Sequence, residues 1–290
     1  MKNKKTFLIL VVLFVISLVY THFAESGKKI NPEKESENLA VTFLNVGQGD
    51  SSFVEFPNGK CMLIDASTPG EGEKISNHIA AKGYSKIDYI VATHPHNDHI
   101  GGMKYVTDCF EIGSVYMPDA AGTSDTYLSL LKAFKRLGTN VVKAEGGVEF
   151  AEGDVKVEFL SPLRDEYEEL NDYSAVVKIT YHKKSFLFTG DAEELVETDI
   201  LESGADIKAH VLKVGHHGSS SSTSDAFLEA VSPEIAVISC GKDNDYGHPH
   251  KEILNRLEEA DVKLYRTDVN GDVTLVSNGQ EVANYYDLYN

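Results

Sequence analysis

Short apolar segments, many of which alternate with polar residues, recur along the chain from residue 39 to residue 276. Alternation with a period of two residues is typical of strands that bury one face. We expect strands at residues 39–46, 51–56, 61–66, 87–93, 155–160, 175–181, 185–189, 211–214, 235–239 and 273–276. Helical spacing lies between them, at 73–82, 124–137, 192–202, 224–230 and 251–260, and Ser224 is the expected N-cap of the fourth helix.

The predicted strands fall into two groups, and helices follow each group. A sheet must bury its apolar face, so this order favours two stacked sheets that are covered by helices on the outside. With 290 residues, of which 42% are hydrophobic, the chain is long enough for one large domain. The class expected is therefore α+β.

The first 24 residues have the pattern of a signal peptide or membrane anchor. Lys2, Lys4 and Lys5 precede an apolar run at 7–19, which residues 20–24 extend. Cleavage after Ala24 would place His22 at position −3, which disfavours a cleaved peptide and favours an anchor. Residues 25–38 are rich in charge and predict a polar linker. The folded domain should then cover 39–290 and lie outside the cytoplasm, membrane-anchored or secreted.

The formal net charge of −18 narrows the functional classes. A surface that binds nucleic acid by electrostatic attraction is normally basic, so such a surface is disfavoured. A nuclease is still allowed, because bound metal ions supply local positive charge.

Three cysteines, Cys61, Cys109 and Cys240, lie in or beside apolar segments. We expect buried free thiols; one disulfide with a leftover thiol is the alternative in an oxidising compartment. Metal ligation by these cysteines is not expected.

The segment THPHNDHIGG at 93–102 carries the most specific chemistry. It follows the predicted strand DYIVA and offers four metal-binding side chains within six residues: His94, His96, Asp98 and His99. Packing has no use for such a cluster, whereas divalent ions favour imidazole and carboxylate together. A short loop cannot wrap all four around one open centre, so we expect two ions, one held by His94 and His96 and the other by Asp98 and His99.

Further ligands are expected at the ends of other strands. Asp191 follows SFLFTG, and it could either cap the next helix or bridge two metals; its fixed position after an apolar strand favours bridging. The remaining candidates are histidines that follow two later strands: His216, His217, His248 and His250.

Together these motifs resemble a known family. NVGQGDS (45–51), LIDAS (63–67), THPHNDHIGG, NDYS (171–174), FTGDAE (188–193), LKVGHHGSSSS (212–222) and YGHPH (246–250) occur in the order found in metallo-β-lactamase fold hydrolases. Within that fold they resemble the extracellular nuclease-like domain of ComEC-type competence proteins. The match covers residues 39–275 without a competence channel, so we expect a stand-alone form. Asn45 and Asp172 stand where the subgroup usually has Asp and Asn.

The resemblance implies a four-layer αββα sandwich with its site along one edge. It also implies that His94, His96 and a late histidine, for which we choose His217, hold one ion, that Asp98, His99 and His248 hold the other, and that Asp191 bridges them. Asp65 would orient ligands through hydrogen bonds. His216 and His250 are alternative ligands, or residues that orient ligands. Asp98, Asp191 and Asp65 are thus the candidate catalytic carboxylates.

The expected reaction is hydrolysis by a metal-bridging hydroxide, because two divalent ions lower the pKa of a shared water. Zn²⁺ is the favoured metal and Mn²⁺ the alternative. The candidate substrate-binding residues are Ser219, Ser220, Asn171 and Ser174, with the serines alternatively forming a flexible exposed loop. Lys213 and Lys242 are further candidates for substrate contact.

Three functions stay open at this point. The first is a nuclease or other phosphodiesterase outside the cytoplasm, whose partners would be nucleic acid and, through the N-terminal segment, a membrane. The second is a phosphorylcholine esterase-like hydrolase of cell-envelope esters, which the anchor and the acidic surface favour. The third is a non-catalytic binding module on the same fold, which should have lost ligands that this chain retains. No protein partner is inferred.

Overall fold

The computed structural model describes residues 37–120, 122–285 and 287. The chain divides into Met1–Glu35 and a compact unit, Ser36–Asn290. The predicted signal or anchor (1–24), and the predicted linker (25–38) apart from Glu37 and Asn38, lie outside the described residues. Every helix within the described ranges is too short or too polar to cross a bilayer.

The first sheet contains eight strands among the described residues, in the order β15-β14-β1-β2-β3-β4-β5-β6. Its pairs from β3 to β6 are parallel and the others are antiparallel. The strands are β1 (Leu39–Phe43), β2 (Ser52–Glu55), β3 (Cys61–Ile64), β4 (Lys86–Val91), β5 (Glu111–Met117), β6 (Asn140–Lys143), β14 (Val273–Ser277) and β15 (Val282–Asn284).

The second sheet has seven strands within the same described ranges, in the order β13-β12-β11-β10-β9-β8-β7. It is parallel from β10 to β13 and antiparallel from β7 to β10. The strands are β7 (Glu149–Glu152), β8 (Val155–Phe159), β9 (Val177–Tyr181), β10 (Lys184–Phe188), β11 (Val211–Lys213), β12 (Ile235–Ile238) and β13 (Lys263–Arg266).

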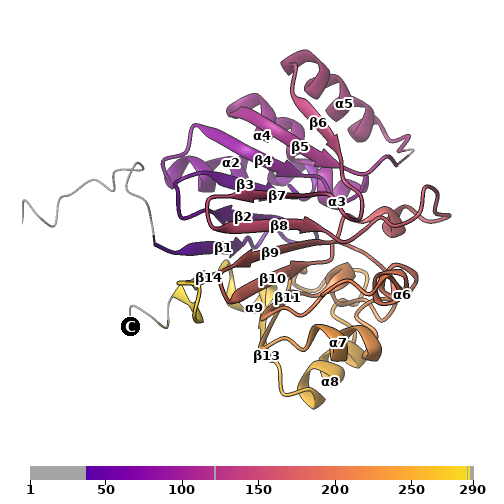
Figure 1. Ribbon diagram of the computed structural model, residues 1–290. Coiled ribbons are helices and arrows are strands. Elements are labelled where there is room, and N and C mark those ends of the chain that lie inside the picture. The colour runs from indigo at the N-terminus through magenta and orange to yellow at the C-terminus, as the bar shows by residue number, and fades with distance from the viewer. Residues whose placement is uncertain (1–36, 121, 286, 288–290) are drawn as a thin grey trace, which may run out of the picture. The chain divides into compact units, whose positions relative to one another are not determined.

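Helices cover the outer faces of both sheets, with α2, α4 and α5 on the side of the first sheet and α6, α7 and α8 on the side of the second (Figure 1). The α-helices are α2 (Gly72–Ala81), α3 (Asn97–Ile100), α4 (Met103–Cys109), α5 (Asp125–Leu137), α6 (Glu194–Ser203), α7 (Asp225–Val231), α8 (Lys251–Glu259) and α9 (Thr267–Asn270). The 3₁₀ turns are η1 (Pro69–Glu71), η2 (Leu170–Tyr173) and η3 (Gly215–Gly218).

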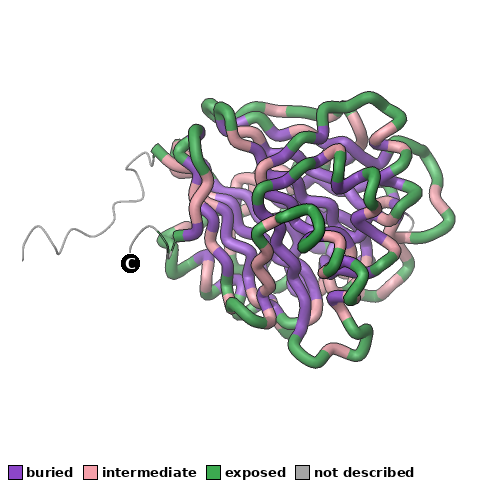
Figure 2. Tube along the Cα trace, turned by 90° about the horizontal axis from the view of Figure 1, so that it is seen from below, coloured by how far each residue is buried: buried purple, intermediate pink, exposed green. Residues whose placement is uncertain are grey.

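Three apolar cores join the four layers. Leu39, Val41 and Phe43 of β1 lie in the core between the sheets, together with Val177 and Ile179 of β9, as alternation along a strand requires. A second core joins the first sheet to its helices, and a third joins the second sheet to its own. Buried strands run through the interior while exposed segments lie around it (Figure 2). The predicted four-layer αββα sandwich is confirmed.

All ten predicted strands and all five predicted helices are present, with ends shifted by up to three residues. Ser224 caps α7, since its side chain accepts a hydrogen bond from the Phe227 amide. The prediction missed β5, β6, β7, β13 and β15, and also α3, α4 and α9. Most of these elements are short or partly exposed, so they lack the apolar alternation by which the other strands were identified.

All three cysteines are free, which excludes the disulfide alternative. Cys61 and Cys240 are buried as expected, but Cys109 is exposed, so its predicted burial is wrong. The reason is that α4 buries Met103, Val106 and Thr107, whereas Cys109, its last residue, lies on the exposed side with Asp108.

Replacing Glu197 by alanine should lower the free energy of unfolding by about 2 kcal/mol, because a buried donor without an acceptor costs roughly 1–3 kcal/mol. The Glu197 side chain, 1% exposed, lies on α6 and accepts hydrogen bonds from the amides of Thr223 and Ser224 before α7. Urea denaturation measures the loss. Glu197→Gln keeps one acceptor and should lose less, so equal stability of the alanine variant and the wild type would contradict this role.

Candidate metal centre

The candidate ligands lie at one edge of the two sheets because each follows the carboxyl end of a strand in a parallel pair. Such strand ends are where open α/β sheets place their ligands. The order along the chain is β3 then Asp65, β4 then His94 to His99, β10 then Asp191, β11 then His216 and His217, and β12 then His248.

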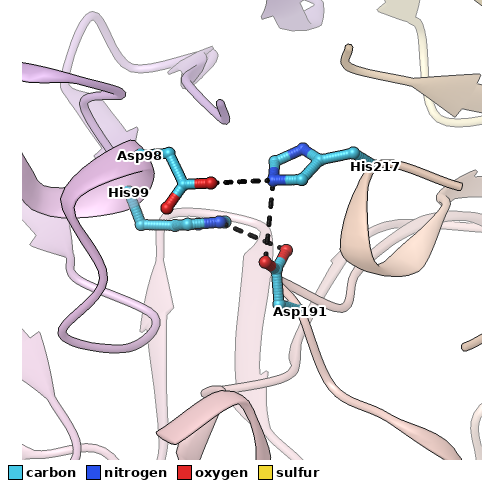
Figure 3. A group of neighbouring side chains, drawn as sticks. All are labelled: Asp98, His99, Asp191 and His217. Atoms are coloured by element: carbon cyan, nitrogen blue, oxygen red, sulfur yellow. Dashed lines mark ion pairs between the residues drawn. The ribbon is translucent and has the colours of Figure 1, made fainter. Parts of the chain in front are cut away.

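Four of these side chains, which come from three separate segments of the chain, form one compact group: Asp98, His99, Asp191 and His217 (Figure 3). His99 Nε2 lies 3.2 Å from Asp191 Oδ1, and His217 Nε2 lies 3.4 Å from Asp98 Oδ2 and 3.6 Å from Asp191 Oδ2. Their ligand atoms all lie within 4.8 Å of one another. Two imidazoles and two carboxylates thus face a common point.

Two other carboxylates fix the orientation of these imidazoles from behind. Asp65 Oδ2 lies 2.7 Å from His99 Nδ1. Asp50 Oδ1 and the Ser239 carbonyl oxygen lie 3.2 Å and 3.0 Å from His217 Nδ1. An imidazole that donates from Nδ1 turns the lone pair of Nε2 to the opposite side, which is the arrangement of metal-binding histidines. Asp65 therefore has the orienting position that the sequence predicted.

The facing atoms of this group are buried and lack hydrogen bonds. His99 Nε2, His217 Nε2 and Asp191 Oδ1 have no hydrogen-bond partner among the described residues. A buried polar atom without a partner is costly, and a lone pair that faces a carboxylate is repelled unless a cation lies between them. The residues therefore fit a divalent cation.

The protonation of the metal-free group follows from its carboxylates. Burial favours the neutral imidazole, but Asp191 and Asp50 outweigh it and raise the pKa of His217 to about 10. The pKa of His99 is likewise raised well above its usual value by Asp191 and Asp65, against the effect of burial. Burial raises the pKa of Asp191, but His99 and His217 outweigh it and hold that pKa well below its usual value.

A second group shares Asp191. His94 Nε2 and His216 Nε2 each lie 3.8 Å from Asp191 Oδ2, and His96 Nδ1 lies 3.1 Å from His94 Nε2. Ser174 Oγ lies 3.3 Å from His94 Nδ1 and accepts a hydrogen bond from the Asp191 amide. Asp191 thus lies between two sets of imidazoles, the position expected of a carboxylate that serves two ions.

The distances group the late histidines differently from our expectation. We expected His217 to join His94 and His96, but its ring groups with Asp98 and His99. His216 Nε2 approaches the same oxygen of Asp191 as His94 Nε2 does. The local backbone is left-handed there: His216 and His217 have φ values of +46° and +54°, and their ring planes are inclined by 66°. Left-handed non-glycine residues are costly and cluster at functional sites.

His248 lines the same pocket but lies outside the compact group. Its ring centroid is 5.6 Å from that of His216 and 6.2 Å from that of His217. His250 lies farther out, where its Nδ1 accepts a hydrogen bond from the Ser220 amide. The structure therefore places His248 at the pocket wall and His250 in a position that holds a loop.

The pocket above the two groups has a volume of about 320 Å³. Of the four predicted substrate-binding residues, Asn171 lines it, whereas Ser174 is fully buried beneath the ligands and Ser219 and Ser220 are not part of the lining. The pocket is lined by Gln48, His96, Asn97, Asp98, Asn171, Asp191, His216, His217, Tyr246 and His248. Gln48, Asn97 and Tyr246 were missed as site residues, although each stands within a quoted motif.

The serine segment after His217 is only partly exposed, with Ser220 on the surface. Ser222 is 1% exposed and donates to the Ala192 carbonyl oxygen at 2.8 Å. Ser219 is buried and lies 3.0 Å from Ser221 through their hydroxyl oxygens. These contacts hold the segment against the start of α6 and so fix the histidines before it.

Lys213 does not contact substrate, as its buried position shows. The side chain is 2% exposed, and its Nζ lies 2.8 Å from Asp50 Oδ2. Burial raises the pKa of Asp50, but Lys213 and His217 outweigh it and lower that pKa to about 2. Asp50 was missed because one sequence does not reveal which acidic residue will meet a buried lysine.

Removing divalent ions with EDTA should lower the Tm, and Zn²⁺ or Mn²⁺ should restore it, because a ligand that binds only the folded state stabilises that state. Uptake should also release protons, because His99 and His217 have raised pKa values in the metal-free protein and must lose their protons to bind a metal. Calorimetric titration in buffers of different ionisation enthalpy measures this release. A Tm that does not respond to metal would contradict the site.

Comparison with known proteins agrees with this geometry. The profile of the Metallo-beta-lactamase superfamily matches residues 44–242. ComE operon protein 3 of Bacillus subtilis is 31% identical over 250 residues, which cover 80% of this chain and 32% of that protein. Competence protein ComA of Neisseria gonorrhoeae is 33% identical over 248 residues, which cover 83% of this chain and 33% of that protein. This chain spans about a third of the length of each of these relatives.

Among solved structures, the diiron β-hydroxylase CmlA from Streptomyces venezuelae aligns with 83% of this chain and 54% of its own, with a TM-score of 0.56 and 18% identity. Such a likeness shows the fold alone, and one fold can host several chemistries. The sequence match and the ligand motifs go further than the fold. The chain belongs to the metallo-β-lactamase superfamily of metal-dependent hydrolases, and within it is similar to ComEC-type competence proteins.

Proposed function

We propose that the chain is a binuclear metal-dependent phosphodiesterase that cleaves nucleic acid. The observation that carries the proposal is the convergence of two imidazole groups on the buried carboxylate of Asp191, beneath a pocket open to solvent. His94, His96 and His216 would hold one ion, Asp98, His99 and His217 the other, and Asp191 would serve both. When bound, the two ions would supply an activated water and stabilise the charge that develops on the phosphate.

The chain's own residues prepare this site for a phosphodiester. Asp65 and Asp50 hold the imidazoles of His99 and His217 in one orientation, so no reorganisation is needed during the reaction. Asn97, Asn171 and Gln48 offer neutral amide donors around the pocket. Amides can donate to phosphate oxygens without adding charge, which suits a substrate whose anionic oxygens also face two cations.

The similarity to competence proteins supports nucleic acid as the substrate class, since competence appears in the name of one relative and the ComE operon in that of the other. The test is to incubate the purified protein with single- and double-stranded DNA and RNA, loaded with Zn²⁺ or Mn²⁺ and with EDTA as the control. We expect metal-dependent cleavage of at least one of them. Absence of cleavage of all four by the metal-loaded protein would refute the nuclease.

A second candidate is a hydrolase of cell-envelope phosphodiesters that resembles phosphorylcholine esterases. The net charge of −18 favours it, because an acidic protein repels a polyanion at long range. Turnover of bis(p-nitrophenyl) phosphate and of a phosphorylcholine ester, with no cleavage of nucleic acid, would decide in its favour.

We further propose that the hydrolase domain acts outside the cytoplasm, held by or released from the N-terminal segment. The support is sequence-based: lysines precede an apolar run at 7–19, a pattern that keeps the N-terminus in the cytoplasm. Protease added to intact cells should degrade the domain, whereas a variant that lacks residues 1–24 should be protected. Protection of the full chain would refute this location.

A further inference from the structure

Tyr246 is an exposed aromatic side chain that lines the candidate active-site pocket. It is 66% exposed, and it is the only Phe, Tyr or Trp among the described residues that line this pocket. Lone exposed aromatics are common and carry no meaning by themselves. The position of this ring beside the ligands Asp98, Asp191 and His217 is what calls for an explanation.

The loop that carries Tyr246 is held in one conformation. Asn244 Oδ1 accepts hydrogen bonds from the amides of Tyr246 and His248 at 3.1 and 3.0 Å, and Asn244 Nδ2 donates to the carbonyl oxygens of Gly241 and His248 at 2.8 and 2.6 Å. Gln48 Oε1 accepts from the Gly241 amide at 3.0 Å, which ties this loop to the first sheet. The ring is therefore presented by a preorganised loop.

The Tyr246 ring lies beside the imidazole of His248 and is otherwise largely exposed. The ring lies parallel to the imidazole of His248, with centroids 5.7 Å apart and planes inclined by 21°. His248 in turn lies close to His216 and His217. Since Tyr246 is 66% exposed and lines the pocket, its ring is accessible to a planar group at the mouth of the pocket.

We propose that Tyr246 is a stacking platform for an unpaired nucleobase next to the phosphodiester that is cleaved. This inference rests on the proposed nuclease function and deepens it, because it selects single-stranded nucleic acid. Bases in a duplex are stacked on their neighbours, whereas an unpaired base can stack on an aromatic side chain without regard to its sequence. The acidic protein cannot attract a polyanion by net charge, so affinity must come from local contacts, which are the bound metal ions and side chains such as a stacking ring.

A single aromatic ring fits a planar base better than a quaternary ammonium group. Ligands such as choline are bound in cages of several aromatic rings. No Phe, Tyr or Trp besides Tyr246 lines the pocket within the part of the chain that the structure describes, and the chain has no tryptophan at all.

The test compares Tyr246→Ala, Tyr246→Phe and the wild type on two metal-dependent substrates: a single-stranded oligonucleotide, and the same backbone with abasic sugars throughout. The alanine variant should raise KM for the normal oligonucleotide by roughly 10-fold or more with kcat nearly unchanged, since a stacked base contributes binding. Tyr246→Phe should behave as the wild type. The abasic backbone should be cleaved alike by all three proteins.

Tyr105→Ala is the matched control, because Tyr105 is also exposed but lies on α4 and does not line the pocket. Equal KM values for Tyr246→Ala and the wild type on the normal oligonucleotide would overturn the platform while leaving the nuclease intact. If Tyr246→Ala lost only turnover of a phosphorylcholine ester, the ring would bind a cation and not a base. That result would also overturn the platform. Failure of the wild type to cleave any nucleic acid refutes the proposed function itself, and the platform with it.

Discussion

Asp191→Asn should lower hydrolytic activity by well over about 100-fold. A loss of roughly 100-fold is the most that mutation of a residue that only orients a metal ligand typically causes. Asp191 is 2% exposed and lies between both imidazole groups, 3.2 Å from His99 Nε2 and 3.8 Å from His94 Nε2. Asparagine has the same shape as aspartate but no negative charge. Both groups of imidazoles therefore lose the carboxylate that they share. Phosphodiester turnover and metal content by elemental analysis measure the loss.

Asp154→Asn is the matched control, because Asp154 is an exposed aspartate in the turn between β7 and β8. It should keep full activity and full metal content. Circular dichroism shows whether Asp191→Asn is folded. A folded Asp191→Asn protein with wild-type activity and two bound ions would show that Asp191 does not serve both ions.

Lys213→Met should lower the free energy of unfolding by about 3–5 kcal/mol, the loss typical of removing one partner of a buried ion pair. The Lys213 and Asp50 side chains are 2% and 7% exposed and lie 2.8 Å apart. Without the lysine, the Asp50 carboxylate is a buried charge whose remaining partner is His217. Urea denaturation in EDTA measures the loss without a contribution from metal binding.

The double variant Asp50→Asn/Lys213→Met tests the reason for that loss. It removes both charges and keeps similar volumes, so it should recover most of the stability, because replacing a whole buried ion pair is often neutral. If the double variant were as unstable as Lys213→Met, the loss would come from packing of the lysine chain. The double variant should still bind metal more weakly than the wild type, because a neutral asparagine side chain replaces the carboxylate that orients His217.

Much of the fold was accessible from the sequence because its signals are local. Strands such as β1 and β9 alternate apolar and polar positions, and Ser224 caps α7 through a contact three residues away. The edge strands were not predicted, because their signals are not local. β6 is largely exposed and β7 is half polar, so their pairing with β5 and β8 decides their structure more than their own residues do.

The sequence by itself determined that the chain carries a cluster of imidazoles and carboxylates. It also showed which predicted strands the further candidate metal ligands follow. Spacing within one loop limits which residues can share an ion, so it predicts one ion at His94 and His96 and another at Asp98 and His99. Only the tertiary structure decided that His217 groups with Asp98 and His99, that His216 approaches Asp191, that Asp50 meets Lys213, and that Tyr246 lines the pocket. These outcomes depend on left-handed backbone at two adjacent histidines and on the packing of two sheets, which bring together residues up to 200 positions apart.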